Sequence, residues 1–201
     1  MAGCGCDCQV TVKDASQKQV LIILLLINAV MFVVELTAGW WSESTALIAD
    51  SLDMLADAVV YGIALYAIGR AAQVKIDAAR LSGIFQILLG IGVLLEVLRR
   101  FVWGSEPLSL IIIAVGIIAL IANVICLSLI ARHRQGEIHM RASWIFSKND
   151  VIANIGVIGG GVLVYFLGQA WPDLLIGAII AVVVIWGGVQ ILRDAQTEMA
   201  Q

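Results

Sequence analysis

Long apolar runs and short polar connectors alternate along the chain from about residue 20 to near its end. Each run has at least about 20 residues, the length that an α-helix needs to cross the hydrocarbon core of a bilayer. Because the connectors are short, consecutive helices should lie antiparallel beside each other. The pattern predicts an all-α membrane protein, a bundle of six transmembrane helices with both termini on one side. The predicted spans are residues 20–41, 45–68, 80–103, 108–131, 144–168 and 172–193.

Basic residues are distributed unequally between the two ends of this predicted bundle. Only Arg99 and Arg100 fall at the end opposite the termini. The other ten lie in the N-terminal tail, in the second and fourth connectors, or at helix ends on that same side: Lys13, Lys18, Arg70, Lys75, Arg80, Arg132, Arg134, Arg141, Lys148 and Arg193. Cytoplasmic loops of membrane proteins carry an excess of lysine and arginine. The distribution therefore predicts that both termini are cytoplasmic, and we expect a multi-pass protein of a bacterial inner membrane.

Composition agrees with a membrane protein and excludes one class of partner. Of the 201 residues, 61% are hydrophobic and 13% are charged, whereas soluble proteins average about 25% charged residues. The net charge of −3 gives no support for binding nucleic acid. The first apolar run begins near Val20 and is long enough to span a membrane, so we interpret it as a helix and not as a signal peptide.

The chain divides into three predicted parts, which are a polar tail at 1–18, a six-helix domain at 19–195 and a short tail at 196–201. The first tail contains a Cys-x-Cys-x-Cys run, formed by Cys4, Cys6 and Cys8. As thiolates these residues could hold a soft metal, but their spacing differs from the Cys-x-x-Cys of structural zinc sites. A short disordered tail without metal is the alternative interpretation.

Three aspartates interrupt the second apolar run. Asp50, Asp53 and Asp57 are spaced by three and four residues, so on an α-helix they lie along one stripe. A carboxylate near the middle of a bilayer costs about 3 kcal/mol on insertion scales, so the stripe needs cations, protons or water. For Asp53 and Asp57, which lie deeper in the run, we predict a functional role. Asp50 is explained equally well as a residue at the membrane surface or at the helix start.

Other polar residues in the apolar runs pair at helical spacing. Asp150 and Asn154 are four residues apart in the fifth run, and Asn28 and Glu35 are seven apart in the first. We expect structural roles for several more. Glu96 should form ion pairs with the two arginines that follow it, and Asp173, just after a proline, should cap its own helix. Helix packing is predicted for Asn123 and Cys126, and solvation for the loop residues His133 and His139.

Several segments together resemble the cation diffusion facilitator family. They are ELTAGWWSESTALIADSLDMLAD at 35–57, MRASWIFSKND at 140–150, the glycine-rich stretch after it, Trp171-Pro-Asp173 and Arg193-Asp194. The resemblance covers nearly all of residues 20–195 in order. It implies a metal-ion/proton antiporter that exports zinc or a related ion. It also identifies this chain as a short form without the family's C-terminal cytoplasmic domain, so any homodimer should form through transmembrane helices.

The resemblance further implies a metal site shared by the second and fifth helices. The family's helix 2 pair matches Asp53 and Asp57, and its helix 5 aspartate matches Asp150. The remaining family ligand, four residues before Asp150, is replaced by Phe146, which cannot bind a metal. We expect Asn154 to supply the fourth ligand. Other groups that could do so are the side chains of Ser147 and Asn149, or a water molecule.

The oxygen-rich ligand set gives Co²⁺, Fe²⁺ and Mn²⁺ weight beside Zn²⁺ and Cd²⁺. Zn²⁺ is the expected ion because it is the usual ion of the family that the chain resembles. Clustered carboxylates should hold protons when the site is empty and release them to the entering metal. No resident cofactor is expected. Glu35 is interpreted as a proton relay or as an interhelical hydrogen-bond partner, and Asp50 as a supporting carboxylate beside a donor such as Ser44.

Two other function classes fit the aspartates less well. Membrane phosphatidyltransferases carry Asp-Gly-x-x-Ala-Arg before their aspartate pair, and membrane zinc proteases carry His-Glu-x-x-His. Neither motif occurs here, so we do not expect an enzyme. A non-transporting membrane module that pairs with another subunit remains an alternative, because Phe146 stands at a ligand position.

Overall fold

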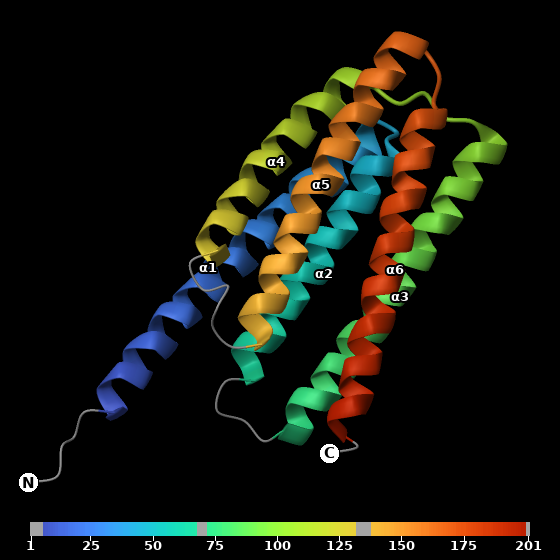
Figure 1. The fold of residues 1–201 in the computed structure, drawn as a ribbon. Coiled ribbons are helices and arrows are strands. Elements are labelled where there is room, and N and C mark those ends of the chain that lie inside the picture. Colours follow the sequence, from blue (N-terminus) through green and yellow to red (C-terminus); the bar gives the residue numbers. More distant parts are fainter. Residues whose placement is uncertain (1–5, 68–71, 132–137, 200–201) are drawn as a thin grey trace, which may run out of the picture.

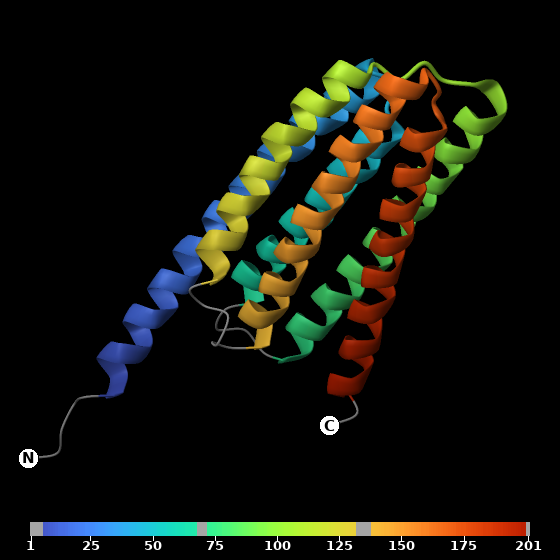
Figure 2. The same ribbon diagram turned by 45° about the horizontal axis from the view of Figure 1, so that its top comes forward.

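The computed structural model describes residues 6–67, 72–131 and 138–199, and their regular structure is entirely helical. Six helices form an antiparallel bundle with both chain ends at the same end of the molecule (Figures 1 and 2). We call this end the terminus end and the opposite end the far end. The helices are α1 (Cys6–Trp41), α2 (Thr45–Ala67), α3 (Ala72–Trp103), α4 (Ser109–Ala131), α5 (Ile138–Leu167) and α6 (Trp171–Met199).

Five of these helices, all except α2, are long and apolar enough to cross a membrane. The chain is therefore an all-α membrane protein, as predicted. Helix α2 has 23 residues and a similar length to α4, but its three aspartates make it too charged to qualify by composition. It contacts α1, α3, α5 and α6. A helix with this many neighbours can place its carboxylates against protein and away from lipid, and a sixth crossing by α2 stays a prediction.

Helices α3 and α6 pack closely along their length, and their backbones meet at glycines. A Cβ atom added to Gly83 would lie 2.8 Å from the carbonyl oxygen of Gly188, and one added to Gly188 would lie 2.7 Å from that of Gly83. Two helical turns after Gly83 on α3, a Cβ atom added to Gly90 would clash with the side chain of Ile185 on α6. Small residues at such contacts let helices approach closely in a bilayer, where van der Waals packing drives association.

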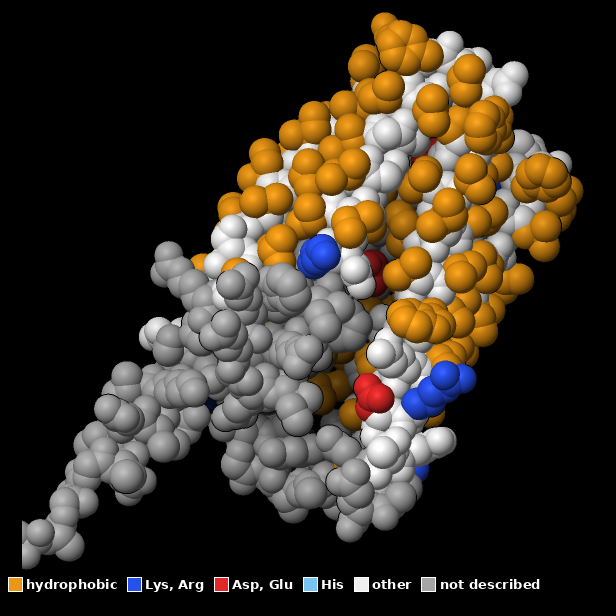
Figure 3. Space-filling view, viewed as in Figure 1, with side chains coloured by type: hydrophobic (Ala, Val, Ile, Leu, Met, Phe, Trp, Pro, Cys, Tyr) orange, Lys and Arg blue, Asp and Glu red, His pale blue; other side chains and the backbone are white. Residues whose placement is uncertain are grey.

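Apolar side chains cover much of the outer surface of the bundle, as Figure 3 shows for the described part of one face. Exposed Leu, Ile and Phe side chains on α3 and α4 belong to this surface. Trp40 and Trp41 are 74% and 80% exposed where α1 ends, as expected for aromatic residues at a membrane interface. The predicted pairing of Glu96 is confirmed, with contacts of 2.7 Å to Arg99 and 2.6 Å to Arg100.

Candidate functional site

Two carboxyl groups from different helices meet inside the bundle. Asp57 lies in the middle of α2 and Asp150 in α5, and both are buried. Their side chains lie within hydrogen-bonding reach of each other. Because carboxylates offer only acceptors, such a contact requires a proton on one of the two groups. The hydroxyl of Tyr61, one turn along α2, also donates to Oδ2 of Asp57 at 3.1 Å.

Asp53 and Asn154 lie one turn away from this pair. Asp53 is half-buried and interacts electrostatically with both Asp57 and Asp150. The Nδ2 of Asn154 donates to the backbone carbonyl of Asp150 at 2.9 Å, while its Oδ1 is buried without a donor. The amide oxygen is therefore free to accept a further interaction, such as one with a cation. In Figure 3 an acidic side chain is visible at the bottom of the furrow between α5 and α6.

A second carboxyl pair lies nearer the far end. Glu35 of α1 and Asp50 of α2 are almost fully buried and lie close enough to interact with each other. Among the residues that the structure describes, neither oxygen of Glu35 nor Oδ2 of Asp50 has a hydrogen-bond partner. The expected support of Asp50 by Ser44 is wrong, because the hydroxyl of Ser44 is directed to Asp173. Two buried carboxyl groups this close are costly when both are charged. This pair, like the pair formed by Asp57 and Asp150, which we call the inner pair, should therefore hold a proton.

The predicted ligands approach one another in pairs and do not form a closed shell. Among the residues that the structure describes, no three His, Cys, Asp or Glu side chains converge closely enough to hold a metal ion. Asp57 is engaged by Tyr61 and Asp150, which a metal would have to displace. A metal ion that bound here would therefore replace the proton that Asp57 and Asp150 share.

The structure places one residue near the inner pair that we had assigned to packing alone. Cys126 of α4 is buried, and its thiol is close enough to the carboxyl groups of Asp57 and Asp150 to interact electrostatically with both. Asn28 of α1 donates to its sulfur at 4.0 Å and to the carbonyl of Leu24 at 2.9 Å. The predicted interhelical role of Cys126 is thus correct. Its closeness to the carboxylates depends on how α4 and α5 are rotated, which their sequences do not specify.

Several predicted residues fall outside the described part. The backbone of Phe146 belongs to α5, but its side chain and that of Ser147 are not described. The same is true of the side chains of Cys6 and Cys8. Cys4 and His133 lie outside the described residues altogether.

Asp173 has a different partner from the one expected. Its carboxylate accepts hydrogen bonds from the hydroxyl of Ser44 at 2.5 Å and from the backbone amides of Thr45 at 2.5 Å and Ala46 at 3.3 Å. These groups form the first turn of α2, so Asp173 caps a neighbouring helix and not its own. The composition of the Trp-Pro-Asp sequence fits either arrangement, and only the packing of α6 against α2 decides between them.

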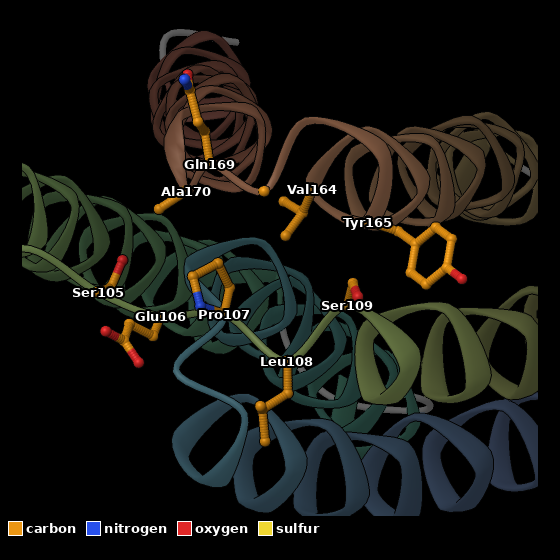
Figure 4. Close-up of a pocket in the computed structure, with 10 residues that line it drawn as sticks. Ser105, Glu106, Pro107, Leu108, Ser109, Val164, Tyr165, Gln169 and Ala170 are labelled. Carbon is orange, nitrogen blue, oxygen red and sulfur yellow. The ribbon is translucent and has the colours of Figure 1, made fainter.

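A surface cavity of about 430 Å³ lies apart from these carboxyl groups (Figure 4). It opens at the far end between the α3–α4 connector and the end of α5, where Pro107 and Val164 face each other. Glu106 is the one ionisable carboxyl group in its lining, and none of the predicted metal ligands reaches it. The cavity is therefore separate from the candidate metal site.

Comparison with known proteins identifies the family. Residues 21–200 match the model of the cation efflux transmembrane domain. The chain belongs to the cation efflux family. This membership confirms the resemblance to cation diffusion facilitators, which are transporters and not enzymes. The match also covers α2, so the helix with the three aspartates is part of the family's transmembrane domain.

Three curated relatives illustrate the similarity. A protein of Bacillus velezensis named cadmium, cobalt and zinc/H(+)-K(+) antiporter is 25% identical over 194 residues, which are 90% of this chain and 62% of that protein. The zinc transporter ZitB of Yersinia pseudotuberculosis is 24% identical, covering 94% of this chain and 64% of its own length. The metal cation efflux system protein CzcD of Cupriavidus metallidurans is 26% identical, covering 82% and 56%. The chain thus spans less than two thirds of the length of these relatives.

Proposed function

We propose that this protein exports a divalent transition-metal ion, Zn²⁺ in the first place, in exchange for protons. Cd²⁺, Co²⁺, Fe²⁺ and Mn²⁺ are the related ions that the same oxygen ligands would accept. The observation that carries the proposal is the contact between Asp57 and Asp150, which joins α2 and α5 inside a cation efflux domain. The names of the relatives, which include zinc, cadmium and cobalt, support the choice of ions.

The chemistry follows from the charges of the site. An entering divalent ion would bind the carboxylates of Asp53, Asp57 and Asp150. The protons that these groups hold in the empty site, among them the one shared by Asp57 and Asp150, would then leave. When the metal departs on the other side, protons return to the carboxyl groups, because bare charges are costly in a low-dielectric environment. Oδ1 of Asn154 is the neutral oxygen ligand that we assign to the shell, since it is buried without a donor.

Glu35 and Asp50 are assigned to the proton path of this exchange. They lie between the Asp57–Asp150 pair and the far end, and they are close enough to interact with each other. Two buried carboxyl groups at this separation are costly when both are charged, so at least one of them should hold a proton. With the termini in the cytoplasm, as the distribution of basic residues favours, the far end faces outward. Protons entering from outside would then reach Glu35 and Asp50 before they reach Asp57.

A flux measurement with the purified chain tests the proposal. In proteoliposomes with a metal-sensitive dye inside, we expect Zn²⁺ uptake that depends on a proton gradient and stops when a protonophore collapses it. Vesicles without protein provide the background. If the chain alone shows no uptake of any of the five ions, the non-transporting module is the better description.

Restoring the family ligand should strengthen metal binding. We expect Phe146→His to raise the affinity for Zn²⁺ by about tenfold or more, since even outer-shell changes alter metal affinity by about 10–100-fold. Phe146→Leu is the matched control, because it changes the side chain without adding a ligand. Isothermal titration of the three proteins gives the affinities, and an unchanged value for Phe146→His would remove position 146 from the site.

A further inference from the structure

The start of α2 is held by a side chain from α6, and this contact is built entirely from buried groups. Asp173, Ser44 and Thr45 are all 0% exposed. Asp173 accepts the two shortest bonds, each 2.5 Å, from Ser44 Oγ and the amide of Thr45, and a third from the amide of Ala46. Oγ of Ser44 in turn accepts a hydrogen bond from the backbone amide of Leu47 at 3.1 Å. The free amides at the start of a helix are thereby satisfied from another helix.

The backbones of the two helices also touch at this point. One turn after Asp173, a Cβ atom added to Gly177 would lie 2.9 Å from the carbonyl carbon of Thr45 and 3.2 Å from the amide nitrogen of Ala46. No larger residue fits there without moving α6 away from α2. The contact therefore combines a charged acceptor at a helix N-terminus, which the helix dipole favours, with close backbone packing.

The connector between α3 and α4 holds the residues just before α2, in the turn that joins α1 to α2. The amide of Leu108 donates to the carbonyl of Ser42 at 2.9 Å, and the amide of Glu106 donates to Oε2 of Glu43 at 3.0 Å. Glu43 has a positive φ of 50°, as expected for the tight turn that joins α1 to α2. Asp173 of α6 and the α3–α4 connector together thus hold the segment from Ser42 to Ala46 at the far end.

We propose that Asp173 is a positioning residue that latches the far end of the transporter shut. The latch fixes the axial position of α2, and with it Asp53 and Asp57, while the metal site is closed toward that end. Release of an ion at the far end requires α2 and α6 to separate there, so the three hydrogen bonds to Asp173 must break in each cycle. This inference rests on the proposed transport function for its role, but the contact itself can be tested without metal or flux.

Cysteine accessibility in lipid nanodiscs tests the latch. In a background with the four native cysteines changed to serine, Ala49→Cys reports on the far end and Ala195→Cys on the terminus end, since both alanines are buried. We expect Asp173→Asn to accelerate labelling of the first reporter by a water-soluble thiol reagent about tenfold or more. The reason is that hydrogen bonds to a charged acceptor are stronger than those to a neutral one. The labelling rate of the second reporter, Ala195→Cys, should stay the same.

Two further variants complete the test. Asp194→Asn makes the same charge change at an exposed position of α6 and should leave both reporters unchanged. Ser44→Ala removes one of the three donors and should accelerate the far-end reporter less than Asp173→Asn does. If Asp173→Asn does not fold, faster labelling of the far-end reporter in Ser44→Ala is the result that tests the latch.

Equal labelling of the far-end reporter in parent and variants overturns the latch. Faster labelling of both reporters also overturns it, because Asp173 would then act on the stability of the whole bundle. Labelling needs no metal, so its outcome is separate from the flux measurement. A chain that transports nothing can still show the latch, and a chain without the latch can still transport.

Discussion

Changing Asp57 to alanine should abolish proton-coupled metal flux while the protein still folds and inserts. Asp57 contacts Asp150 across the α2–α5 interface and is the central member of the predicted ligand set. Its loss would remove a proposed metal ligand and the partner with which Asp150 shares a proton. Outer-shell changes already reduce metal affinity by about 10–100-fold, so we expect more than about a 100-fold loss of initial flux. Dye-loaded proteoliposomes with equal amounts of each protein provide the measurement.

Two companion variants show whether the loss is specific. Asp194→Ala removes a carboxylate from an exposed position of α6 and should leave flux within about twofold of the parent, since exposed charges contribute little. Tyr61→Phe removes the hydroxyl that donates to Oδ2 of Asp57 and should slow flux without abolishing it. Undiminished flux in the Asp57→Ala protein would contradict the assignment of the metal site.

Hydropathy predicted the apolar parts of the helices closely but not their ends. The second and fourth runs were placed at 45–68 and 108–131, and the structure has α2 at Thr45–Ala67 and α4 at Ser109–Ala131. In contrast, α3 begins at Ala72, eight residues before the predicted span. The difference arises because hydropathy reports only the stretch that suits hydrocarbon, while a helix continues into the aqueous region as long as its backbone bonds are satisfied.

The partners of polar residues were less predictable than their positions. Spacing within one helix correctly indicated that Asp150 and Asn154 share a buried face. It could not show that Glu35 meets Asp50, or that Asp173 reaches the first turn of α2. Such contacts depend on the relative rotation and axial offset of two helices. These quantities come from packing between elements distant in the chain, which the periodicity of a single helix does not contain.

The same packing argument predicts opposite effects for two glycine substitutions in the α3–α6 region. Gly188→Ala should destabilise the protein, because its new Cβ would lie 2.7 Å from the backbone oxygen of Gly83, which cannot move without shifting α3. Overpacking of this kind costs about 1–3 kcal/mol, and each kcal/mol lowers the midpoint of thermal unfolding by about 2–4 °C in a chain of this length.

Gly92→Ala, on the exposed face of α3, is the matched control. No atom lies within 4 Å of the added Cβ, so only the gain in helix propensity remains, about 0.5–1 kcal/mol in favour of alanine. Thermal unfolding followed by circular dichroism in one detergent should therefore give a lower midpoint for Gly188→Ala than for the parent, and an unchanged or higher one for Gly92→Ala. Equal midpoints for the two variants would show that α3 and α6 do not depend on this glycine contact. The close approach that aligns α6, and through Asp173 the start of α2, would then need another cause.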